Sequence, residues 1–406
     1  MSLKRRYWFS LPVIALIAAL LPSPVAAAST VTLVASGLDS PRGVAFVGRS
    51  AVVAEAGHGS DNPADCLGAG PGKACFGKTS QISWVNTANG AHMPLVKGFF
   101  SLHAGFDTLG LSGLSVRDGK IYAQIAGTSR EVPPQFTIGK QAGDLISVNP
   151  RNGTWKSIAS VGDFNFDYTV ANFTEPNPPV CGACPGTQEH DTNPNDVLAT
   201  SDGWLVVDSG SNTLTKVGKN GKMTVLHHFP WRAATRSFPS DEVPTCIAST
   251  DEALWIGTLA GHLFRLEEDE ATQVTPKDSA GKALLSHVTG CTFGDNGTLY
   301  LVNMFGAGNP GEPSFFNGSV VKYDTESGKG SILADAVHNP ALSLPYMAKV
   351  GPDGNLWVTS GAICGVGGAD PFAGAPFPTP PNPCTIGSKK GGRLLKISLP
   401  KSEEND

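Results

Sequence analysis

Apolar residues along this chain alternate with polar ones or gather in short clusters, and turn residues separate the clusters. This pattern is typical of β-strands, and few stretches show the spacing of an amphipathic helix. The clearest unit begins with the apolar strand Pro194–Ala199, turns at Asp202-Gly203 and continues as a second apolar strand, Leu205–Asp208, that ends on an acid. A looser copy of this unit recurs along almost the whole chain, so we expect a repeat protein.

Six copies of the unit align, and each has a third strand after the first two. The first strands begin, in chain order, at Pro41, Leu111, Pro194, Pro244, Val288 and Pro345. The first five copies continue into a fourth strand, in most of them after a tight turn such as Asn152-Gly153. Copies with little inserted sequence repeat about every 45 to 50 residues, a period typical of a four-stranded propeller blade.

The sixth copy ends after its third strand, Arg393–Ile397. At the other end of the chain, Val31–Leu38 resembles the fourth strands Met93–Phe99 and Gly330–Ala336. We expect this N-terminal segment to complete the last blade, because such an exchange closes the ring and removes its open edges. The predicted fold is all-β, a six-bladed β-propeller with blades of four antiparallel strands. The alternative is a pair of β-sandwiches whose turn spacing is coincidental.

Composition and charge narrow the possible partners. Charged residues make up 16% of the chain and the formal net charge is -5, so neither value supports binding to nucleic acid or to an anionic membrane surface. A hydrophobic content of 40% can build a substantial core, and 48 glycines and 31 prolines, spread along the chain, suit many turns.

The N-terminal segment has the features of a signal peptide. A basic start, Lys4-Arg5-Arg6, precedes the apolar run Phe9–Leu21, and Ala26-Ala27-Ala28 offers small residues for cleavage. The alternative is an uncleaved anchor helix, although the run is short for a membrane span of about 20 residues. We predict a secreted or periplasmic monomer with no membrane association after cleavage. The predicted parts are a signal peptide (1–28), the propeller (29–400) and a disordered tail (401–406).

Eight cysteines agree with export, because disulfides form in oxidising compartments. Six of them lie in close pairs inside Gly/Pro-rich insertions: Cys66 with Cys75, Cys181 with Cys184, and Cys364 with Cys384. We expect a disulfide in each pair, where it limits loop entropy. Cys181-Gly-Ala-Cys184 has a redox or zinc motif as its alternative, but no second CxxC or His pair accompanies it. Cys246 and Cys291 either pair with each other or remain buried thiols.

Long insertions fall almost entirely on one face of the expected ring. In an up-and-down blade, the loop between strands two and three and the loop to the next blade share a face. Insertions of this kind are 58–80, 127–143, 163–193, 306–318 and 363–391, whereas the turns on the other face are short. We name these the elaborated face and the plain face. Binding or catalysis is expected on the elaborated face, where a rigid scaffold carries variable loops.

Strand direction predicts which residues ring the channel mouth on the elaborated face. First strands enter from this face with Arg42, Ser112, Asn195, Thr245, Thr289 and Tyr346. Second strands end on it with Glu55, Gln124, Asp208, Asn303 and Ser360, and interblade loops add His103 and His190. We predict a ligand-binding rim for a small molecule, a glycan or a protein, made of Arg42, Glu55, His103, Gln124, Asn195, Asp208, Asn303 and Tyr346.

A divalent metal such as Ca²⁺ is one hypothesis for this rim. Glu55, Asn195 and Asp208 offer oxygen ligands, and a metal held there could polarise a carbonyl or activate water. The alternative is structural: Asn195 caps the turn into its strand, and Asp208 accepts backbone N–H groups where its strand ends. His190, beside Asp191, is a weak candidate for acid–base catalysis, against the alternative of an ordinary loop histidine.

Three segments resemble the ScyD/ScyE family of exported propellers: Val34–Gly43, Asn193–Val197 and the closing Gly392-Arg393-Leu394. The resemblance covers the mature chain and implies export and a six-bladed ring more than an activity. The unit from Asn195 to Asp208 is also similar to gluconolactonase-like and strictosidine-synthase-like propellers. In the former, an Asn and acids from other blades hold a divalent metal. The acid that this pattern expects at the first inner strand is absent here, because Arg42 stands in its place.

Two classes of function follow as hypotheses. The first is an exported ScyD/ScyE-type protein that binds a ligand at the channel mouth or serves as an accessory or scaffold in an exported pathway. The second is a divalent-metal-dependent hydrolase, lactonase or lyase with its site at the same place. Whether the chain is an enzyme stays open at this level, because one fold hosts many functions.

Overall fold

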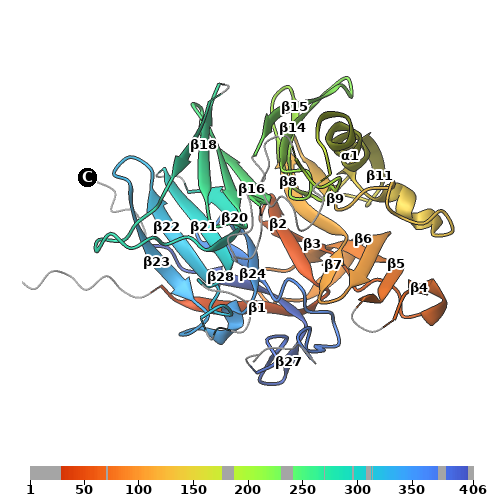
Figure 1. The fold of residues 1–406 in the computed structure, drawn as a ribbon. Helices are drawn as coiled ribbons and strands as arrows, with labels where there is room; N and C mark the ends of the chain where they lie inside the picture. The colour runs from red at the N-terminus through yellow and green to blue at the C-terminus, as the bar shows by residue number, and fades with distance from the viewer. Residues whose placement is uncertain are drawn as a thin grey trace, which may run out of the picture.

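A computed structural model describes residues 29–400 except 70–71, 176–186, 230–240, 269, 295–296, 308–311, 313 and 374–380. Six small antiparallel sheets stand in a ring, which confirms the six-bladed β-propeller (Figure 1). The predicted signal peptide (1–28) and tail (401–406) lie outside the described residues. Among the helices of the described part, none is long and apolar enough to cross a membrane.

Blades two to five each have four strands in sequence order, from the channel outward. Blade two contains β8 (Leu111–Arg117), β9 (Lys120–Ile125), β10 (Asp144–Val148) and β11 (Trp155–Ser160). Blade three contains β12 (Pro194–Ala199), β13 (Gly203–Asp208), β14 (Thr213–Gly218) and β15 (Met223–His228). Blade four contains β16 (Pro244–Ser249), β17 (Leu254–Thr258), β18 (Leu263–Glu267) and β19 (Glu270–Val274). Blade five contains β20 (His287–Phe293), β21 (Thr298–Phe305), β22 (Ser319–Asp324) and β23 (Lys329–Asp335).

The two ends of the propeller meet in blade six. This blade contains β24 (Pro345–Val350), β25 (Leu356–Ser360), β28 (Gly392–Ile397) and, as its outer strand, β1 (Val31–Leu38). In the antiparallel pairing of β1 with β28, Val31 lies opposite Ile397 and Leu33 opposite Leu395. The predicted strand exchange is therefore confirmed. Because β1 covers the edge of β28, the ring closes without an unpaired strand at the seam.

Blade one is larger than the sequence pattern predicts. Its four regular strands are β2 (Pro41–Val47), β3 (Ser50–Glu55), β5 (Ala74–Val85) and β6 (His92–Ala104), and β4 (Cys66–Leu67) and β7 (Asp107–Leu109) extend the sheet. The insertion 58–80 and the segment after the fourth strand were expected to be loops. The end of the insertion, from Ala74, and the segment as far as Ala104 instead extend β5 and β6 beyond the strands of the other blades, as Cys75 opposite His103 shows.

Two smaller features lie outside the blade pattern. The helix α1 (Val161–Asn172) follows β11, where the sequence predicts only an interblade loop, and Asn165 and Thr169 on it are buried. The short hairpin of β26 (Thr385–Ile386) and β27 (Lys389–Lys390) lies in a loop, and so do three short 3₁₀ helices within the described ranges. The 3₁₀ helices are Pro63–Asp65, Thr137–Gln141 and Pro340–Leu342.

Neighbouring blades pack face to face through apolar side chains. Ile82 of blade one and Ile146 of blade two share one buried cluster, and Val302 of blade five and Val358 of blade six share another. Around the channel the innermost strands approach so closely that Gly43 has no room for a side chain: a Cβ there would lie 2.3 Å from the carbonyl oxygen of Ser112. Burial of apolar side chains, each contributing about 1.5–3 kcal/mol, holds the ring together.

Three of the predicted disulfides are present. Cys66–Cys75 and Cys364–Cys384 each close an insertion on the elaborated face. Cys246–Cys291 joins the innermost strands of blades four and five, with 5.7 Å between the Cα atoms. Of the two possibilities for these cysteines, the structure therefore has the disulfide and not two buried thiols. Cys181 and Cys184 lie outside the described residues.

Candidate functional site

A β-bulge interrupts every innermost strand near the elaborated face. The pairing of first and second strands shifts register at 41–44, 111–114, 194–196, 244–246, 288–290 and 345–348. A bulge bends its strand and re-aims a side chain. The residues at these bulges include the six that the sequence places at the entry of the first strands, and all six line one cavity on the channel axis: Arg42, Ser112, Asn195, Thr245, Thr289 and Tyr346.

The cavity has a volume of about 120 Å³ and walls that are mainly apolar. Apolar side chains in the wall include Phe106, Leu109, Leu259, Met304, Phe305 and Ile363. An apolar cavity of about 150 Å³ is known to hold benzene, whereas pockets for drug-sized ligands measure about 300–1,000 Å³. The cavity therefore fits a single small ring or the end of a longer molecule.

Arg42 supplies the positive charge of the cavity and is only 7% exposed. Its Nη2 donates to the carboxylate of Asp107 and, at 3.1 Å, to the carbonyl oxygen of Thr108. The guanidinium carbon lies 4.4 Å from the centre of the Tyr346 ring. Burial alone lowers the pKa of Arg42, but Asp107 and Tyr346 outweigh it and raise the pKa, so the side chain stays charged.

The Nε atom of Arg42 is buried and has no hydrogen-bond partner among the described residues. A buried donor without a partner costs free energy comparable to that of a lost hydrogen bond. The cavity thus combines mainly apolar walls with a charged guanidinium group, one donor of which has no partner among the described residues. Such an arrangement favours a ligand that has an apolar body and a hydrogen-bond acceptor.

Asn195 connects four of the six innermost strands. Its Oδ1 accepts hydrogen bonds from the Tyr346 hydroxyl at 2.7 Å and from the Ser112 hydroxyl at 2.8 Å, and its Nδ2 donates to the carbonyl oxygen of Thr245 at 2.7 Å. A second cavity, of about 430 Å³, lies further along the same strands toward the plain face, where Leu198 and Lys349 line it. Asn195 and Tyr346 therefore form a polar bridge across the channel between the two cavities.

The residues that end the second strands do not line the cavity, which differs from the prediction for Glu55, Gln124, Asp208 and Asn303. Glu55 accepts from the backbone N of Asp39 at 2.6 Å and from Gln81 at 2.9 Å. Asp208 accepts from the backbone N of Asn193 at 2.7 Å, of Gly210 at 3.0 Å and of Ser211 at 3.0 Å, and also from the side chains of Asn165 and Thr192.

Gln124 and Asn303 likewise form hydrogen bonds with backbone groups of loops instead of lining the cavity. The Nε2 atom of Gln124 donates to the carbonyl oxygen of Gly143 at 3.1 Å, and Oδ1 of Asn303 accepts from the backbone N of Ser286 at 3.2 Å. These four side chains satisfy backbone groups of the loops that join the strands, because buried backbone donors and acceptors need partners. This is the structural role that the sequence offers as the alternative for Asp208.

The three residues predicted to hold a metal are accordingly not gathered at one place. Asn195 lines the cavity, whereas Glu55 and Asp208 are engaged within blades one and three. Burial raises the pKa of Glu55 despite three hydrogen bonds to it. Among the described residues, no group of three or more His, Cys, Asp or Glu side chains has the arrangement of a metal site.

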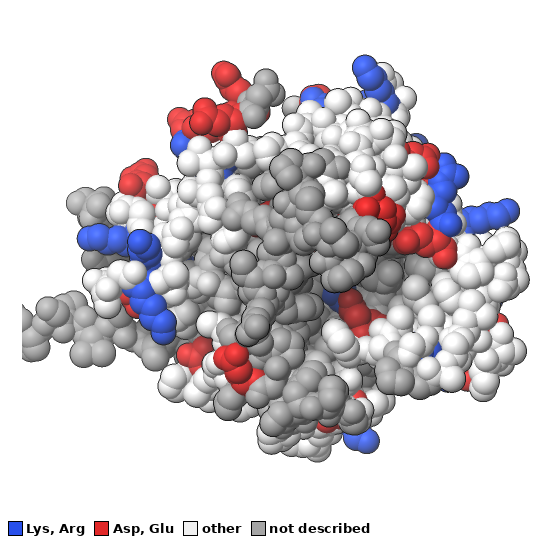
Figure 2. Space-filling model, in the orientation of Figure 1, with Lys and Arg blue, Asp and Glu red and all other residues white. Residues whose placement is uncertain are grey.

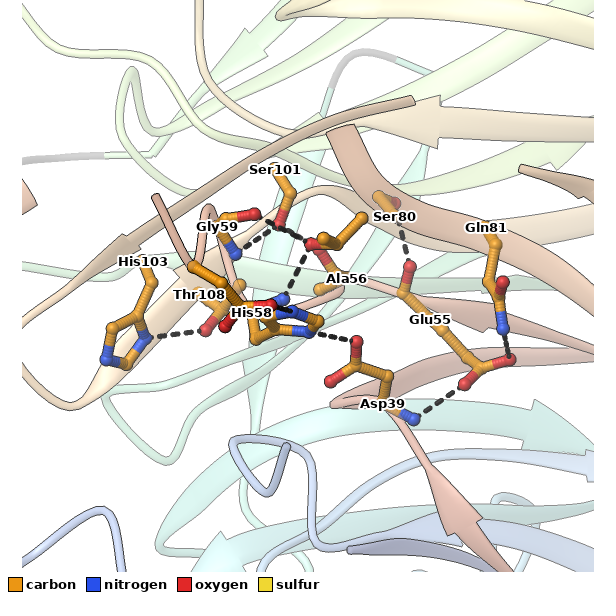
Figure 3. A network of polar contacts seen from close by, with 12 residues as sticks. Asp39, Glu55, Ala56, His58, Gly59, Ser80, Gln81, Ser101, His103 and Thr108 are labelled. Carbon is orange, nitrogen blue, oxygen red and sulfur yellow. Dashed lines mark hydrogen bonds and ion pairs between the residues drawn. The ribbon is translucent and has the colours of Figure 1, made fainter. Parts of the chain in front are cut away.

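The two predicted histidines lie near the cavity loops but outside its wall. His103 contacts the hydroxyl of Thr108 at 3.0 Å, and Thr108 lines the cavity (Figure 3). His190 contacts Oε2 of Glu175 at 2.8 Å and the carbonyl oxygen of Phe173 at 3.1 Å. Both ring nitrogens of His190 are thus engaged in holding its own loop, which supports the interpretation as a loop histidine.

A third histidine, His58, forms an ion pair with a buried carboxylate in this region. Nδ1 of His58 lies 2.5 Å from Oδ2 of the buried Asp39, as Figure 3 shows. The hydrogen bond to Asp39 raises the pKa of His58 to about 9, against the lowering effect of burial. His58 is therefore a cation at neutral pH. It fixes the start of the insertion 58–80 to the loop that leads into β2.

The hairpin of β6 and β7 contributes four cavity residues that were not expected from the sequence: Phe106, Asp107, Thr108 and Leu109. They follow a strand that was expected to end earlier, and nothing in the local pattern marks them. Asp107 reaches Arg42 across 65 positions of sequence. The only signal was the opposite charge of these two residues, which does not select one acid among 35 in the chain.

Comparisons with known proteins extend to the fold alone. The sequence matches no protein-family model and no curated protein. A Bacteroides thetaiotaomicron protein of unknown function is structurally similar, with a TM-score of 0.53 and 12% identity over 91% of this chain and 76% of that chain. A Thermus thermophilus putative oxidoreductase (glucose dehydrogenase) has a TM-score of 0.47 and 13% identity, over 91% of this chain and 100% of that chain. A putative gluconolactonase has a TM-score of 0.43 and 12% identity, over 92% of both chains.

Proposed function

We propose that this chain is an exported ScyD/ScyE-type propeller that binds a small molecule at its channel mouth without transforming it. Three disulfides support export, because such bonds persist in oxidising compartments. The six-bladed ring agrees with the fold that the sequence resemblance implies.

The observation that carries the proposal is the cavity at the six bulges. Its walls are mainly apolar, and the charged Arg42, whose buried Nε has no partner among the described residues, is part of its lining. The polar side chains of Asn195 and Tyr346 are bonded to each other, and no His or Cys is among the described residues that line the cavity. These groups suit recognition of a ligand better than proton transfer or nucleophilic attack.

Small aromatic probes test this function. Benzamide carries an acceptor on a single ring, and benzylamine of similar size carries an ammonium group that Arg42 repels. We expect ligand-observed NMR to detect benzamide binding, and Arg42→Met to weaken it by about tenfold through loss of one charge-assisted hydrogen bond. Arg117→Met, which removes a partly exposed arginine on the plain face, serves as the control.

Ile363→Phe provides a second test that keeps Arg42 in place. The larger ring fills part of the cavity wall, so we expect it to abolish benzamide binding while circular dichroism shows a folded protein. Equal binding of benzamide and benzylamine, or unchanged benzamide binding in both cavity variants, would exclude this cavity as the ligand site.

The metal-dependent hydrolase, lactonase or lyase is the competing hypothesis and makes a different prediction. Titration with Ca²⁺ or Mn²⁺ would then raise the melting temperature of the wild-type protein, because a ligand that binds only the folded state stabilises it. The binding proposal expects no such shift. A rise that disappears in Asn195→Ala and in Asp208→Asn would favour the metal enzyme over the binding protein.

A further inference from the structure

A third concave site lies on the plain face, between blades two and three, away from both cavities on the channel axis. It has a volume of about 350 Å³, which is within the range of ordinary ligand pockets. Three lysines line it: Lys120 beside the turn from β8 to β9, Lys156 near the start of β11, and Lys219 in the turn from β14 to β15. We name this site the lysine groove.

The charge of the lysine groove is not neutralised locally. No Asp or Glu is among the described residues that line it, and none of the three lysines forms an ion pair with a described residue. The neighbouring acids already have their own cations: Asp118 lies 3.7 Å from Arg117, and Asp202 lies 2.5 Å from Lys216.

The positive charge of this cluster contrasts with the negative net charge of the chain. The chain has a formal net charge of -5, and Figure 2 shows acidic and basic side chains scattered over the face in view without a large region of one sign. Three ammonium groups that have no ion-pair partner among the described residues surround one concave surface, and together they create a local positive potential that attracts a multiply charged anion.

Aromatic and hydroxyl groups complete the wall. The rings of Tyr122 and Trp204, one from each blade, lie 5.3 Å apart between centroids with 60° between their planes. Both side chains are partly exposed, and Ser147 and Ser157 stand beside them. Flat apolar rings cover the C–H face of a sugar, and hydroxyls bond to its hydroxyl groups, so the uncharged part of the groove suits a carbohydrate.

We propose that the lysine groove binds an acidic oligosaccharide, with its carboxylates at Lys120, Lys156 and Lys219 and one sugar ring against Tyr122 and Trp204. Blades two and three supply complementary parts of this site, so it exists only where these two neighbouring blades pack together. It lies on the face that the distribution of insertions does not favour for binding. It is also independent of the ligand proposed for the channel mouth.

The experiment uses the α-1,4-linked hexamer of galacturonic acid as its probe, with maltohexaose as the neutral hexamer. Isothermal titration calorimetry should detect binding of the acidic hexamer and none of maltohexaose at the same concentration. The triple variant Lys120→Gln/Lys156→Gln/Lys219→Gln should bind the acidic hexamer about tenfold more weakly, because each exposed ion pair contributes a modest part. Raising the salt to about 0.3 M should weaken wild-type binding as well.

A matched triple variant controls for total charge. Lys97→Gln/Lys282→Gln/Lys329→Gln removes three exposed lysines that are not in the groove, and it should bind like the wild type. Tyr122→Leu keeps an apolar side chain but removes the flat ring, and it should weaken binding about fivefold. Melting curves confirm that each variant folds.

Three results would overturn the proposal. One is the absence of measurable binding of the acidic hexamer. Another is an equal loss of affinity in the groove triple variant and the control triple variant, which would indicate that the hexamer is attracted by the overall charge of the protein. The third is binding of tripolyphosphate as tight as that of the hexamer together with no effect of Tyr122→Leu, which would indicate a general anion site instead of a sugar site.

Discussion

The hydroxyl of Tyr346 donates a 2.7 Å hydrogen bond to the side-chain oxygen of Asn195, although 151 positions separate the two residues. They belong to the innermost strands of blades six and three, which face each other in a ring of six. Ser112 of blade two donates to the same oxygen. The channel is therefore crossed by a polar bridge whose parts come from three blades.

Removing Asn195 should destabilise the protein more than removing its partner's hydroxyl. Asn195→Ala leaves the hydroxyls of Ser112 and Tyr346 and the carbonyl oxygen of Thr245 without their partner, and we expect a loss of about 2–4 kcal/mol in the free energy of unfolding. Tyr346→Phe removes one bond and should cost about 1 kcal/mol. Urea denaturation measures the free energy of unfolding of both variants. Equal losses in the two variants would show that the bridge does not link the blades.

Asp208 should be a structural residue of blade three. Its carboxylate accepts hydrogen bonds from three backbone N–H groups and two side chains while fully buried, so Asp208→Ala should lower the free energy of unfolding by about 3 kcal/mol or more. Asp202→Ala in the exposed turn of the same blade is the control and should cost about 0.5 kcal/mol. A small loss for Asp208→Ala would contradict the structural role.

The pair of His58 and Asp39 should make stability depend on pH. The folded protein raises the pKa of His58 from 6.5 to about 9, so the pair stabilises the fold fully below pH 6.5. That contribution is lost as the pH rises through about 9, where the folded protein releases the proton. The difference in melting temperature between wild type and His58→Gln should thus be largest near about pH 6 and vanish above about pH 9.5.

The exposed His92 provides the comparison for this pH series. His92→Gln should leave the melting curve unchanged at each pH where His58→Gln lowers it. A difference between wild type and His58→Gln that stays constant from pH 6 to pH 10 would show that the pair is not formed in solution.

The disulfides should differ in how much they stabilise the fold. Cys246–Cys291 closes 45 residues and joins two blades at the channel, whereas Cys66–Cys75 closes nine. In the chain-entropy model the larger loop contributes about 1.4 kcal/mol more. Replacing Cys246 and Cys291 together with Ala should therefore lower the urea midpoint more than the same change at Cys66 and Cys75. The reverse order would indicate that loop closure does not set their effect.

The sequence predicted most of the architecture because blade strands are local features. Alternation of apolar residues and Asp-Gly or Asn-Gly turns fixed strands such as β13, β17 and β25 within a residue or two of their observed bounds. The resemblance of Val31–Leu38 to a fourth strand predicted the closure by β1. Helix α1 was not predicted because its apolar residues are not confined to one face. Two of its polar residues, Asn165 and Thr169, are buried, and Asn165 donates a hydrogen bond to Asp208 of blade three.

Sequence reasoning placed the six entry residues of the first strands at the channel, because strand direction and repeat register are readable from the pattern. It could not separate them from the residues that end the second strands, since both sets are polar and near the same face. The tertiary structure made that distinction through the β-bulges, which turn Arg42 and Asn195 inward, and through loop N–H groups that engage Glu55 and Asp208. The contact of Arg42 with Asp107 within blade one, and the meeting of Lys156 of blade two with Lys219 of blade three in one groove, depend on how strands distant in sequence pack together, and no local pattern encodes them.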